Sequence, residues 1–444
     1  MIVGLDSMPR ALAFDLFADR MPVLTSMRER GCFGRLRSTD PPVTIPAWIT
    51  MTSGVPPERL GIYGFRGRGR GSRKMRLVTR ASVRPDRIWD TAAGAGLTSA
   101  VVSVPLTFPV DRTPEVTMTG CFMTPGPDSD WASPDGTAEE LTRLFGPYLV
   151  DVDEFRIEDR AAVLDRCRRL TTQHFAIFRH LLDTRRPDFG MLVDLGPDRF
   201  HHAMLRHAMP SHPLHDPRDP MVEEAASYYA LLDDEVGRTL EVAGKDAAVM
   251  VVSDHGVRPL SGSVCVNELL AREGYLTLDE KPTKPTPLSR CAVDWSRTLA
   301  WGEGGYHSRI FFNVAGREPG GIIAPGDLPA RKARLARLLK DLRGPDGAPM
   351  ETRVLDRDEI YGPDPEGYPP DLTVYWDGLS MRSAGTVGHG RVFIETNDTG
   401  PDDANHDPDG IFVMTGTDRR GEIEGLQIAD VHGMAMEILG LRGI

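Results

Sequence analysis

Short apolar runs alternate along the chain with longer segments in which apolar residues recur every three or four positions. Runs of the first kind, such as 1–6, 99–104 and 189–195, are expected for strands buried on both faces of a sheet. The longer segments predict amphipathic helices, of which the longest cover 160–182 and 221–242. This rhythm of strand, helix and strand predicts an α/β fold, with a mostly parallel central sheet flanked by helices.

The pattern changes character in the second half of the chain. Between 262 and 394 the predicted strands and helices are shorter and follow no regular alternation. A chain of 444 residues also exceeds the size at which one hydrophobic core stops growing. We therefore predict a core formed by 1–261 and completed by 395–444, with a smaller α+β cap region at 262–394.

Residues 41–54 combine the signals of a helix start and a helix end. Thr44 stands where an N-cap is expected, Pro46 suits the first turn, and Gly54 can end the helix in a left-handed conformation. A threonine at this position faces free backbone N–H groups and the positive end of the helix dipole, which together suit an anion such as phosphate. Thr44 is then either a plain helix cap or a residue that meets an anionic substrate.

Three aspartates and three histidines stand where predicted strands end or predicted helices begin. These residues are Asp6, Asp198, His202, Asp254, His255 and His406. Asp198 and His202 are four positions apart, which places both on one face of a helix. Beside a threonine, such a set of oxygen and nitrogen ligands is what a two-metal phosphoryl-transfer site needs.

At these positions the sequence resembles the alkaline phosphatase superfamily and, within it, the type I phosphodiesterase/nucleotide pyrophosphatase branch. The similar segments occur in the family's order and are Gly4-Leu5-Asp6, Val43-Thr44-Ile45-Pro46-Ala47-Trp48, Pro197-Asp198-Arg199-Phe200-His201-His202, Val252-Ser253-Asp254-His255-Gly256 and Asn405-His406-Asp407-Pro408-Asp409-Gly410. The resemblance implies an alkaline-phosphatase-like fold and a metal-dependent hydrolase of phosphodiester or pyrophosphate bonds.

The resemblance also implies a role for each of these residues. One metal ion would be held by Asp198, His202 and His406. The other would be held by Asp6, Asp254, His255 and the oxygen of Thr44. Thr44 would attack phosphorus and form a phospho-threonine intermediate. A mixed Asp/His ligand set suits two Zn²⁺ ions, with Mn²⁺ or Fe²⁺ as alternatives.

The chain departs from the family pattern where the substrate is expected. Leu60 stands where many members have histidine, and Phe65 stands where nucleotide pyrophosphatases have an asparagine that holds phosphate. A basic, glycine-rich run at 66–74 follows, and it is either a mobile loop or the source of an arginine, such as Arg66, that binds the phosphate. His307 follows a Gly-Gly pair and either contacts a leaving group or has a structural role.

Sister reactions on the same site are the alternatives: hydrolysis of phosphomonoesters, phosphonates or sulfate esters. Thr44 argues against sulfatases, which use a modified cysteine or serine. Histidines 207, 212 and 215 are irregularly spaced in a proline-rich loop, so they are interpreted as loop histidines and not as further metal ligands. A pure binding protein is expected to have lost a metal ligand, and none of the seven predicted ligands is missing.

Net charge and cysteine content limit which partners and which cellular compartment are expected. A net charge of −12 argues against binding to nucleic-acid polymers or acidic lipid, so the expected partner is a small-molecule phosphorus ester. Five scattered cysteines fit reduced thiols better than a disulfide framework. The sequence shows no stretch long enough to span a membrane and no secretory signal, so we expect a cytoplasmic enzyme.

Overall fold

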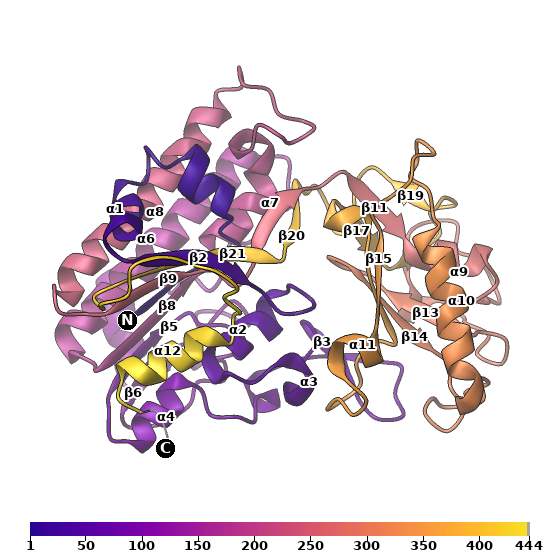
Figure 1. The fold of residues 1–444 in the computed structure, drawn as a ribbon, viewed down its shortest axis with the longest axis horizontal. Helices are drawn as coiled ribbons and strands as arrows, with labels where there is room; N and C mark the ends of the chain where they lie inside the picture. The colour runs from indigo at the N-terminus through magenta and orange to yellow at the C-terminus, as the bar shows by residue number, and fades with distance from the viewer. Residues whose placement is uncertain (442–444) are drawn as a thin grey trace. The chain divides into compact units, whose positions relative to one another are not determined.

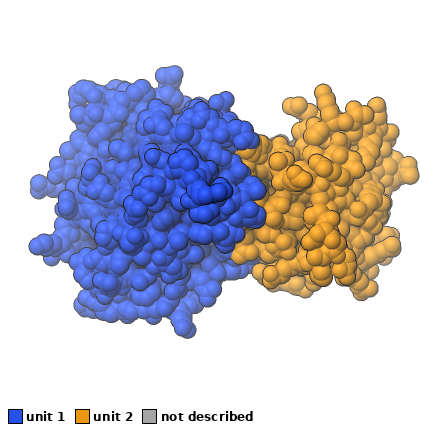
Figure 2. All heavy atoms as spheres, turned by 90° about the horizontal axis from the view of Figure 1, so that it is seen from above, with its two compact units in different colours: residues 1–60, 78–257, 406–444 blue, residues 61–77, 258–405 orange. Residues whose placement is uncertain are grey.

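The computed structural model describes residues 1–441, which divide into two compact units (Figure 2). The larger unit contains residues 1–60, 78–257 and 406–444. The smaller unit contains residues 61–77 and 258–405. The basic, glycine-rich run thus belongs to the smaller unit, although residues 78–257 separate it in sequence from the rest of that unit. Among residues 1–441, no helix combines the length and apolarity that crossing a membrane requires.

The larger unit is built on a nine-stranded sheet (Figure 1). In spatial order its strands are β22 (Gly421–Ile423), β2 (Cys32–Arg37), β21 (Asp409–Thr415), β9 (Val249–Val252), β1 (Ile2–Leu5), β8 (Phe189–Asp194), β5 (Ser99–Val102), β6 (Val116–Thr119) and β7 (Ala132–Ser133). The five strands from β9 to β6 are parallel to one another, while β21 and β7, at either side of them, run antiparallel. The predicted α/β fold with a mostly parallel sheet is confirmed.

Helices cover both faces of this sheet (Figure 1). One face carries α1 (Pro22–Arg30), α6 (Arg160–Arg185), α7 (Gly196–Ala208) and α8 (Met221–Ala243). The other carries α2 (Thr44–Ser53), α4 (Ile88–Gly94) and α12 (Asp430–Ile438). The unit also contains α3 (Pro57–Leu60) and α5 (Thr137–Phe145). Both faces of the central strands are therefore buried, which explains why these strands are mostly apolar.

The smaller unit has α+β architecture. Its larger sheet is antiparallel, in the order β13 (Ala300–Glu303), β14 (Ser308–Phe312), β16 (Leu372–Tyr375) and β15 (Arg353–Asp356). The other strands are β3 (Arg66–Arg68) with β4 (Met75–Leu77), β12 (Thr286–Pro287) with β18 (Thr386–Val387), and β11 (Gly262–Cys265) between β17 (Met381–Ala384) and β19 (Phe393–Ile394). Its helices are α9 (Val266–Arg272), α10 (Leu328–Lys340) and α11 (Arg357–Tyr361).

The start of α2 differs from the prediction by one residue. Val43, in an extended conformation, is the N-cap, and its carbonyl accepts the first helical bond from the N–H of Ala47 at 3.1 Å. Thr44 is already the first helical residue, and its side chain makes no capping bond, so the predicted N-cap role of Thr44 is wrong. Gly54 does end the helix in a left-handed conformation, with φ of 70°. The Thr44 hydroxyl is therefore not used to cap the helix.

A close contact between β1 and α2 fixes the position of this helix. A Cβ atom on Gly4 would lie 2.4 Å from Cη2 of Trp48, so only glycine lets the indole approach the strand this closely. Trp48 is fully buried, and its Nε1 donates a hydrogen bond to Oδ2 of Asp6 at 2.7 Å. The helix that carries Thr44 is thereby held against the strand that carries Asp6.

We expect Gly4→Ala to destabilise the protein by about 1–3 kcal/mol, because the added methyl group overpacks the core beneath Trp48. Gly94→Ala is the matched control, because Gly94 ends α4 and a Cβ atom on it would meet nothing within 4 Å beyond the backbone of its own helix. Alanine there should be neutral or stabilise the helix by up to about 1 kcal/mol. Urea unfolding followed by tryptophan fluorescence measures both. Equal stabilities of the two variants would contradict the proposed packing constraint.

Candidate active site

The seven predicted metal-ligating residues all belong to the larger unit and meet beside the ends of its central strands. Asp6 follows β1, while Asp254 and His255 follow β9. Asp198 and His202 lie in the first two turns of α7, which follows β8. Strands β8, β1 and β9 are parallel neighbours, so their carboxyl ends open at one edge of the sheet. Thr44 opens α2, and His406 lies in β20 (Ala404–Asp407), just before β21.

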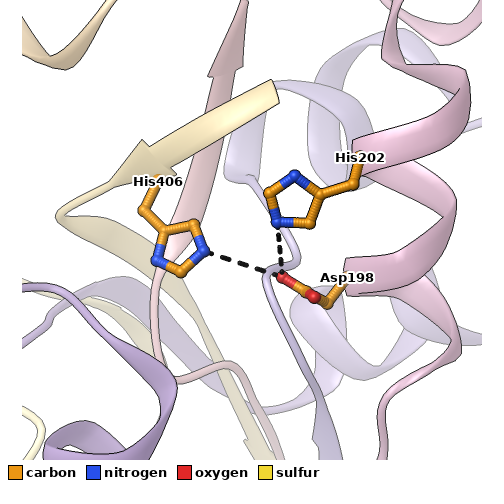
Figure 3. Close-up of side chains that lie close together, drawn as sticks. All are labelled: Asp198, His202 and His406. Carbon is orange, nitrogen blue, oxygen red and sulfur yellow. Dashed lines mark ion pairs between the residues drawn. The ribbon is translucent and has the colours of Figure 1, made fainter. Parts of the chain in front are cut away.

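One group of three side chains is formed by Asp198, His202 and His406 (Figure 3). Oδ1 of Asp198 lies 3.5 Å from Nε2 of His202 and 3.8 Å from Nε2 of His406. All three side chains are buried, and their ligand atoms lie within 4.8 Å of one another. A cation between them would meet two nitrogens and one oxygen.

A second group surrounds Nε2 of His255. This nitrogen lies 3.8 Å from Oδ1 of Asp6, 3.2 Å from Oδ2 of Asp254 and 3.5 Å from Oγ1 of Thr44. Asp198 also has a ligand atom within 4.8 Å of those of Asp6 and His255, so it belongs to both groups. The sequence predicted Asp198 for the first group alone, and the geometry makes it the residue that the two groups share.

Each of the three aspartates has one oxygen held by the protein. Oδ2 of Asp6 accepts from the Trp48 indole, and Oδ2 of Asp198 accepts from Nη1 of Arg199 at 2.6 Å. Oδ1 of Asp254 accepts from the backbone N–H of Ser7 at 3.1 Å. These bonds fix how each carboxylate is rotated, so that its second oxygen faces the histidines.

The second oxygen of each carboxylate is buried and accepts no hydrogen bond from residues 1–441. These atoms are Oδ1 of Asp6, Oδ1 of Asp198 and Oδ2 of Asp254. A buried carboxylate oxygen without a donor costs free energy, and a divalent cation would compensate for that cost. Carboxylate and imidazole are suitable ligands for Zn²⁺, Mn²⁺ and Fe²⁺. The residues present therefore fit two such ions.

Two of the histidines are oriented by backbone carbonyls. Nδ1 of His406 lies 2.8 Å from the carbonyl of Pro42, and Nδ1 of His255 lies 2.9 Å from the carbonyl of Gly256. A carbonyl can only accept, so Nδ1 carries a proton in both rings, and Nε2 is the nitrogen left to bind a metal ion. This is the tautomer that a metal ligand requires.

Burial and mutual repulsion raise the pKa values of two of the carboxyls in the metal-free protein. The pKa of Asp254 is raised to about 8, mainly by burial and also by the charge of Asp198. Burial also raises the pKa of Asp6 well above its usual range, and Asp254 and Asp198 raise it further. Burial acts in the same direction on Asp198, but His202 and Arg199 outweigh it and lower the pKa of that carboxyl.

The three predicted substrate-binding residues, Phe65, Arg66 and His307, belong to the smaller unit, and their role remains a prediction. Arg66 is exposed in β3, and its carbonyl accepts from Nη1 of Arg309 at 2.9 Å. His307 is buried, and neither ring nitrogen has a hydrogen-bond partner among the described residues. Burial, together with the charge of Arg309, lowers the pKa of His307 to about 3.

Part of the basic run forms a strand, and one of its arginines packs inside the smaller unit. Its first strand, β3, pairs with β4, and the guanidinium of Arg68 lies 5.0 Å from the ring centre of Trp301 and 4.6 Å from that of Phe311. Arg68 also forms a buried ion pair with Glu318. Neither interpretation of the run holds for Arg68, because its charge is used to pack the smaller unit.

Sequence reasoning missed the residues that support the predicted ligands. Arg199 pairs with both oxygens of Asp151 while it donates to Asp198, and its guanidinium lies over the ring of Phe155. Ser7, which holds Asp254, directly follows Asp6. The only available signal was that both residues stand next to a predicted ligand. The partners that fix them, Asp254 for Ser7 and Asp151 for Arg199, lie more than 40 residues away in the chain.

Comparison with protein families matches residues 1–373 to the family described as type I phosphodiesterase / nucleotide pyrophosphatase. Comparison with curated protein sequences finds no match. Solved structures with a similar fold include phosphonoacetate hydrolase from Sinorhizobium meliloti in complex with phosphonoformate. That chain is 18% identical, the match covers 99% of this chain and 95% of that one, and the TM-score is 0.66.

Two ectonucleotide pyrophosphatase/phosphodiesterase 5 structures also share the fold. The human protein is 14% identical, with 100% of this chain and 95% of that chain covered and a TM-score of 0.56. The murine protein, as an inactive Thr→Ala variant in complex with AMP, is 13% identical, with the same coverage and a TM-score of 0.58. At these identities the likeness establishes the fold.

We expect the metal-free protein to lose stability as pH rises from about 4 to about 8. An aspartate titrates near 3.9 in the unfolded chain, whereas Asp254 titrates at about 8 in the folded chain. Between these values the folded state holds more protons, so the free energy of unfolding falls with pH. Urea unfolding of chelator-treated protein at pH 5.5 and 8.5 measures the fall, and Zn²⁺ should reduce it by displacing the protons.

The free energy of unfolding of Asp254→Asn should fall less steeply over the same pH range, because this variant lacks one of the carboxyls that release a proton there. Asp188→Asn is the control: Asp188 is exposed, and hydrogen bonds from Thr98 lower its pKa, so its titration lies below this range. A metal-free wild type that is equally stable at both pH values would contradict the assignment of protonated carboxyls.

Proposed function

The chain belongs to the type I phosphodiesterase / nucleotide pyrophosphatase family, and we propose that it hydrolyses phosphodiester or pyrophosphate bonds through a phospho-threonine intermediate on Thr44. One observation carries the proposal. Each of three buried aspartates has one oxygen that faces the histidines and makes no hydrogen bond within residues 1–441. The Thr44 hydroxyl lies 3.5 Å from Nε2 of His255. A nucleophile beside a site for two cations is the arrangement that phosphoryl transfer requires.

Thr44 supplies the attacking oxygen. Its position at the start of α2 points backbone N–H groups and the positive end of the helix dipole toward an incoming phosphate. Its oxygen forms a bond to phosphorus as the bond to the leaving oxygen breaks, and water then cleaves the phospho-threonine. The inactive Thr→Ala variant of the murine relative supports a threonine in this role.

One cation would be held by Asp6, Asp254, His255 and the Thr44 oxygen. The other would be held by Asp198, His202 and His406. Two such ions, when bound, lower the pKa of the threonine hydroxyl and neutralise charge on the phosphate oxygens. Asp198 belongs to both groups, so it would fix the spacing of the two sites. The donor set favours Zn²⁺, with Mn²⁺ or Fe²⁺ as alternatives.

The chain's own residues keep this geometry without help from the substrate. Trp48, Arg199 and Ser7 each hold one carboxylate oxygen, and backbone carbonyls hold two imidazoles. These bonds fix the ligands before a substrate arrives, which is the preorganisation that electrostatic catalysis depends on.

The absence of a third ligand group among residues 1–441 favours esterified phosphate over a bare monoester. A monoester carries an additional negative charge, which a further cation would have to neutralise. Residues 1–441 contain the two overlapping ligand groups and no third one. Phosphonate and sulfate esters remain the alternatives to be tested.

We expect Thr44→Ala to reduce turnover by a factor of about 10³ or more, because a lost nucleophile is not replaced by its neighbours. Both metal ions should still bind, since the six Asp and His ligands are unchanged. Thr50→Ala is the matched control, because Thr50 is a buried threonine of the same helix whose hydroxyl makes no hydrogen bond within residues 1–441. Steady-state kinetics and metal analysis measure the two effects. A Thr44→Ala enzyme that keeps a tenth of wild-type turnover would exclude the covalent route.

We expect bis-p-nitrophenyl phosphate to be cleaved with a kcat/KM about tenfold or more above that of p-nitrophenyl phosphate, because one charge left without a partner costs about 1–3 kcal/mol. Matched phosphonate and sulfate esters complete the panel. Arg66→Ala tests whether an arginine supplies the missing charge, with the exposed Arg70→Ala as control. A monoester preference that disappears in Arg66→Ala alone would reverse the assignment of substrate class.

A further inference from the structure

Ser7 has an unfavourable backbone conformation at a critical place. It directly follows Asp6, it is 1% exposed, and its φ is 65°. This left-handed region costs a residue other than glycine, asparagine or aspartate about 1–2 kcal/mol. The backbone N–H of the same residue donates to Oδ1 of Asp254 at 3.1 Å. The direction of that N–H depends on the backbone angles of Asp6 and Ser7, so the strained conformation aims the bond.

The side chain of Ser7 is held by a chain of two hydrogen bonds. Its Oγ lies 3.1 Å from Nδ1 of His201, and Nε2 of His201 lies 2.6 Å from the hydroxyl of Tyr229. His201 is on α7, between Asp198 and His202. Tyr229 is on α8, and its ring packs against that of Phe17 with the centroids 4.5 Å apart and the ring planes tilted by 36°. Both hydroxyls can donate or accept, so the chain closes with either tautomer of His201.

We propose that Ser7, His201 and Tyr229 are positioning residues, which hold the Ser7 backbone so that Asp254 keeps one oxygen fixed and presents the other to a metal ion. The proposal rests on the proposed function, because it needs a cation beside Asp254. His201 ties α7, the source of Asp198 and His202, to the segment that follows Asp6. The three residues thus connect the elements that supply both ligand groups.

The geometry distinguishes this role from ordinary core packing. A buried histidine that only fills space needs partners for its nitrogens, but those partners need not touch a ligand. Here one partner is Ser7, whose N–H holds Asp254 and whose left-handed backbone conformation is unfavourable for serine. Loss of the chain should therefore weaken the cation beside Asp254 more than the cation beside His406.

The test is a titration of the metal-free, full-length protein with Co²⁺ alone against a competing chelator, followed by the visible absorption of bound Co²⁺. Wild type should show two binding events. Ser7→Ala and Tyr229→Phe should weaken one of them by about 10- to 100-fold, as is typical when a residue that orients a metal ligand is changed, and leave the other within about threefold. Tyr229→Phe keeps the aromatic ring, so its packing is preserved.

Two further variants separate the backbone effect from the hydrogen bonds. Ser7→Gly should bind Co²⁺ more tightly than Ser7→Ala, since glycine adopts a positive φ without strain. His201→Asn can keep the bond to Ser7 while it loses the bond to Tyr229, so it should resemble Tyr229→Phe. His174→Asn is the control for a buried histidine, because Nε2 of His174 lies 2.6 Å from the carbonyl of Leu149 and contacts no predicted ligand.

Thermal unfolding of each metal-free variant shows whether the fold is intact. Two unchanged binding events in Ser7→Ala and Tyr229→Phe, in folded protein, would overturn the positioning role and leave the proposed function standing. Equal weakening of both events would also overturn it, as would Ser7→Gly binding no better than Ser7→Ala. A wild type that binds no Co²⁺ would instead contradict the proposed function itself.

Discussion

Burying Asp6, Asp198 and Asp254 beside one another costs free energy that the protein alone does not recover. Each keeps one oxygen without a hydrogen bond from residues 1–441, and burial with mutual repulsion raises the pKa values of Asp6 and Asp254. A fold retains such an arrangement only if something else compensates for it, and divalent cations are the compensation that this donor set fits. The same three buried carboxylates therefore destabilise the metal-free protein and create its site for cations.

The fold creates this site by bringing three parallel strand ends together. Strands β1, β8 and β9 are neighbours, and the ligands follow them within a few residues. The contact between Gly4 and Trp48 then sets α2, and with it Thr44, against the first strand. The same indole holds Asp6 through its N–H, so one side chain positions both the nucleophile's helix and a ligand.

Local pattern was enough to predict the parallel sheet, because buried strands and helical periodicity are visible in the sequence. Strand ends and an i, i+4 spacing suggested the site residues, but their assignment to two ligand groups came from the family resemblance. Local pattern failed where a partner comes from far along the chain. The hydrogen bonds of Ser7 and Arg199, and the packing of Arg68 on Trp301, depend on tertiary contacts that no local signal encodes. The prediction placed the N-cap of α2 at Thr44, one residue after its actual position at Val43. Both residues lie shortly before Pro46, and only the backbone angles decide which of them is the cap.

Anomalous diffraction from crystals of the zinc-loaded protein, measured on both sides of the zinc absorption edge, locates the bound ions. We expect two zinc peaks in the larger unit, one bounded by Asp198, His202 and His406 and the other by Asp6, Asp254 and His255 with the Thr44 oxygen beside it. Peaks bound to other residues would contradict the two-cation site, as would unoccupied sites in protein that hydrolyses phosphodiesters at full rate.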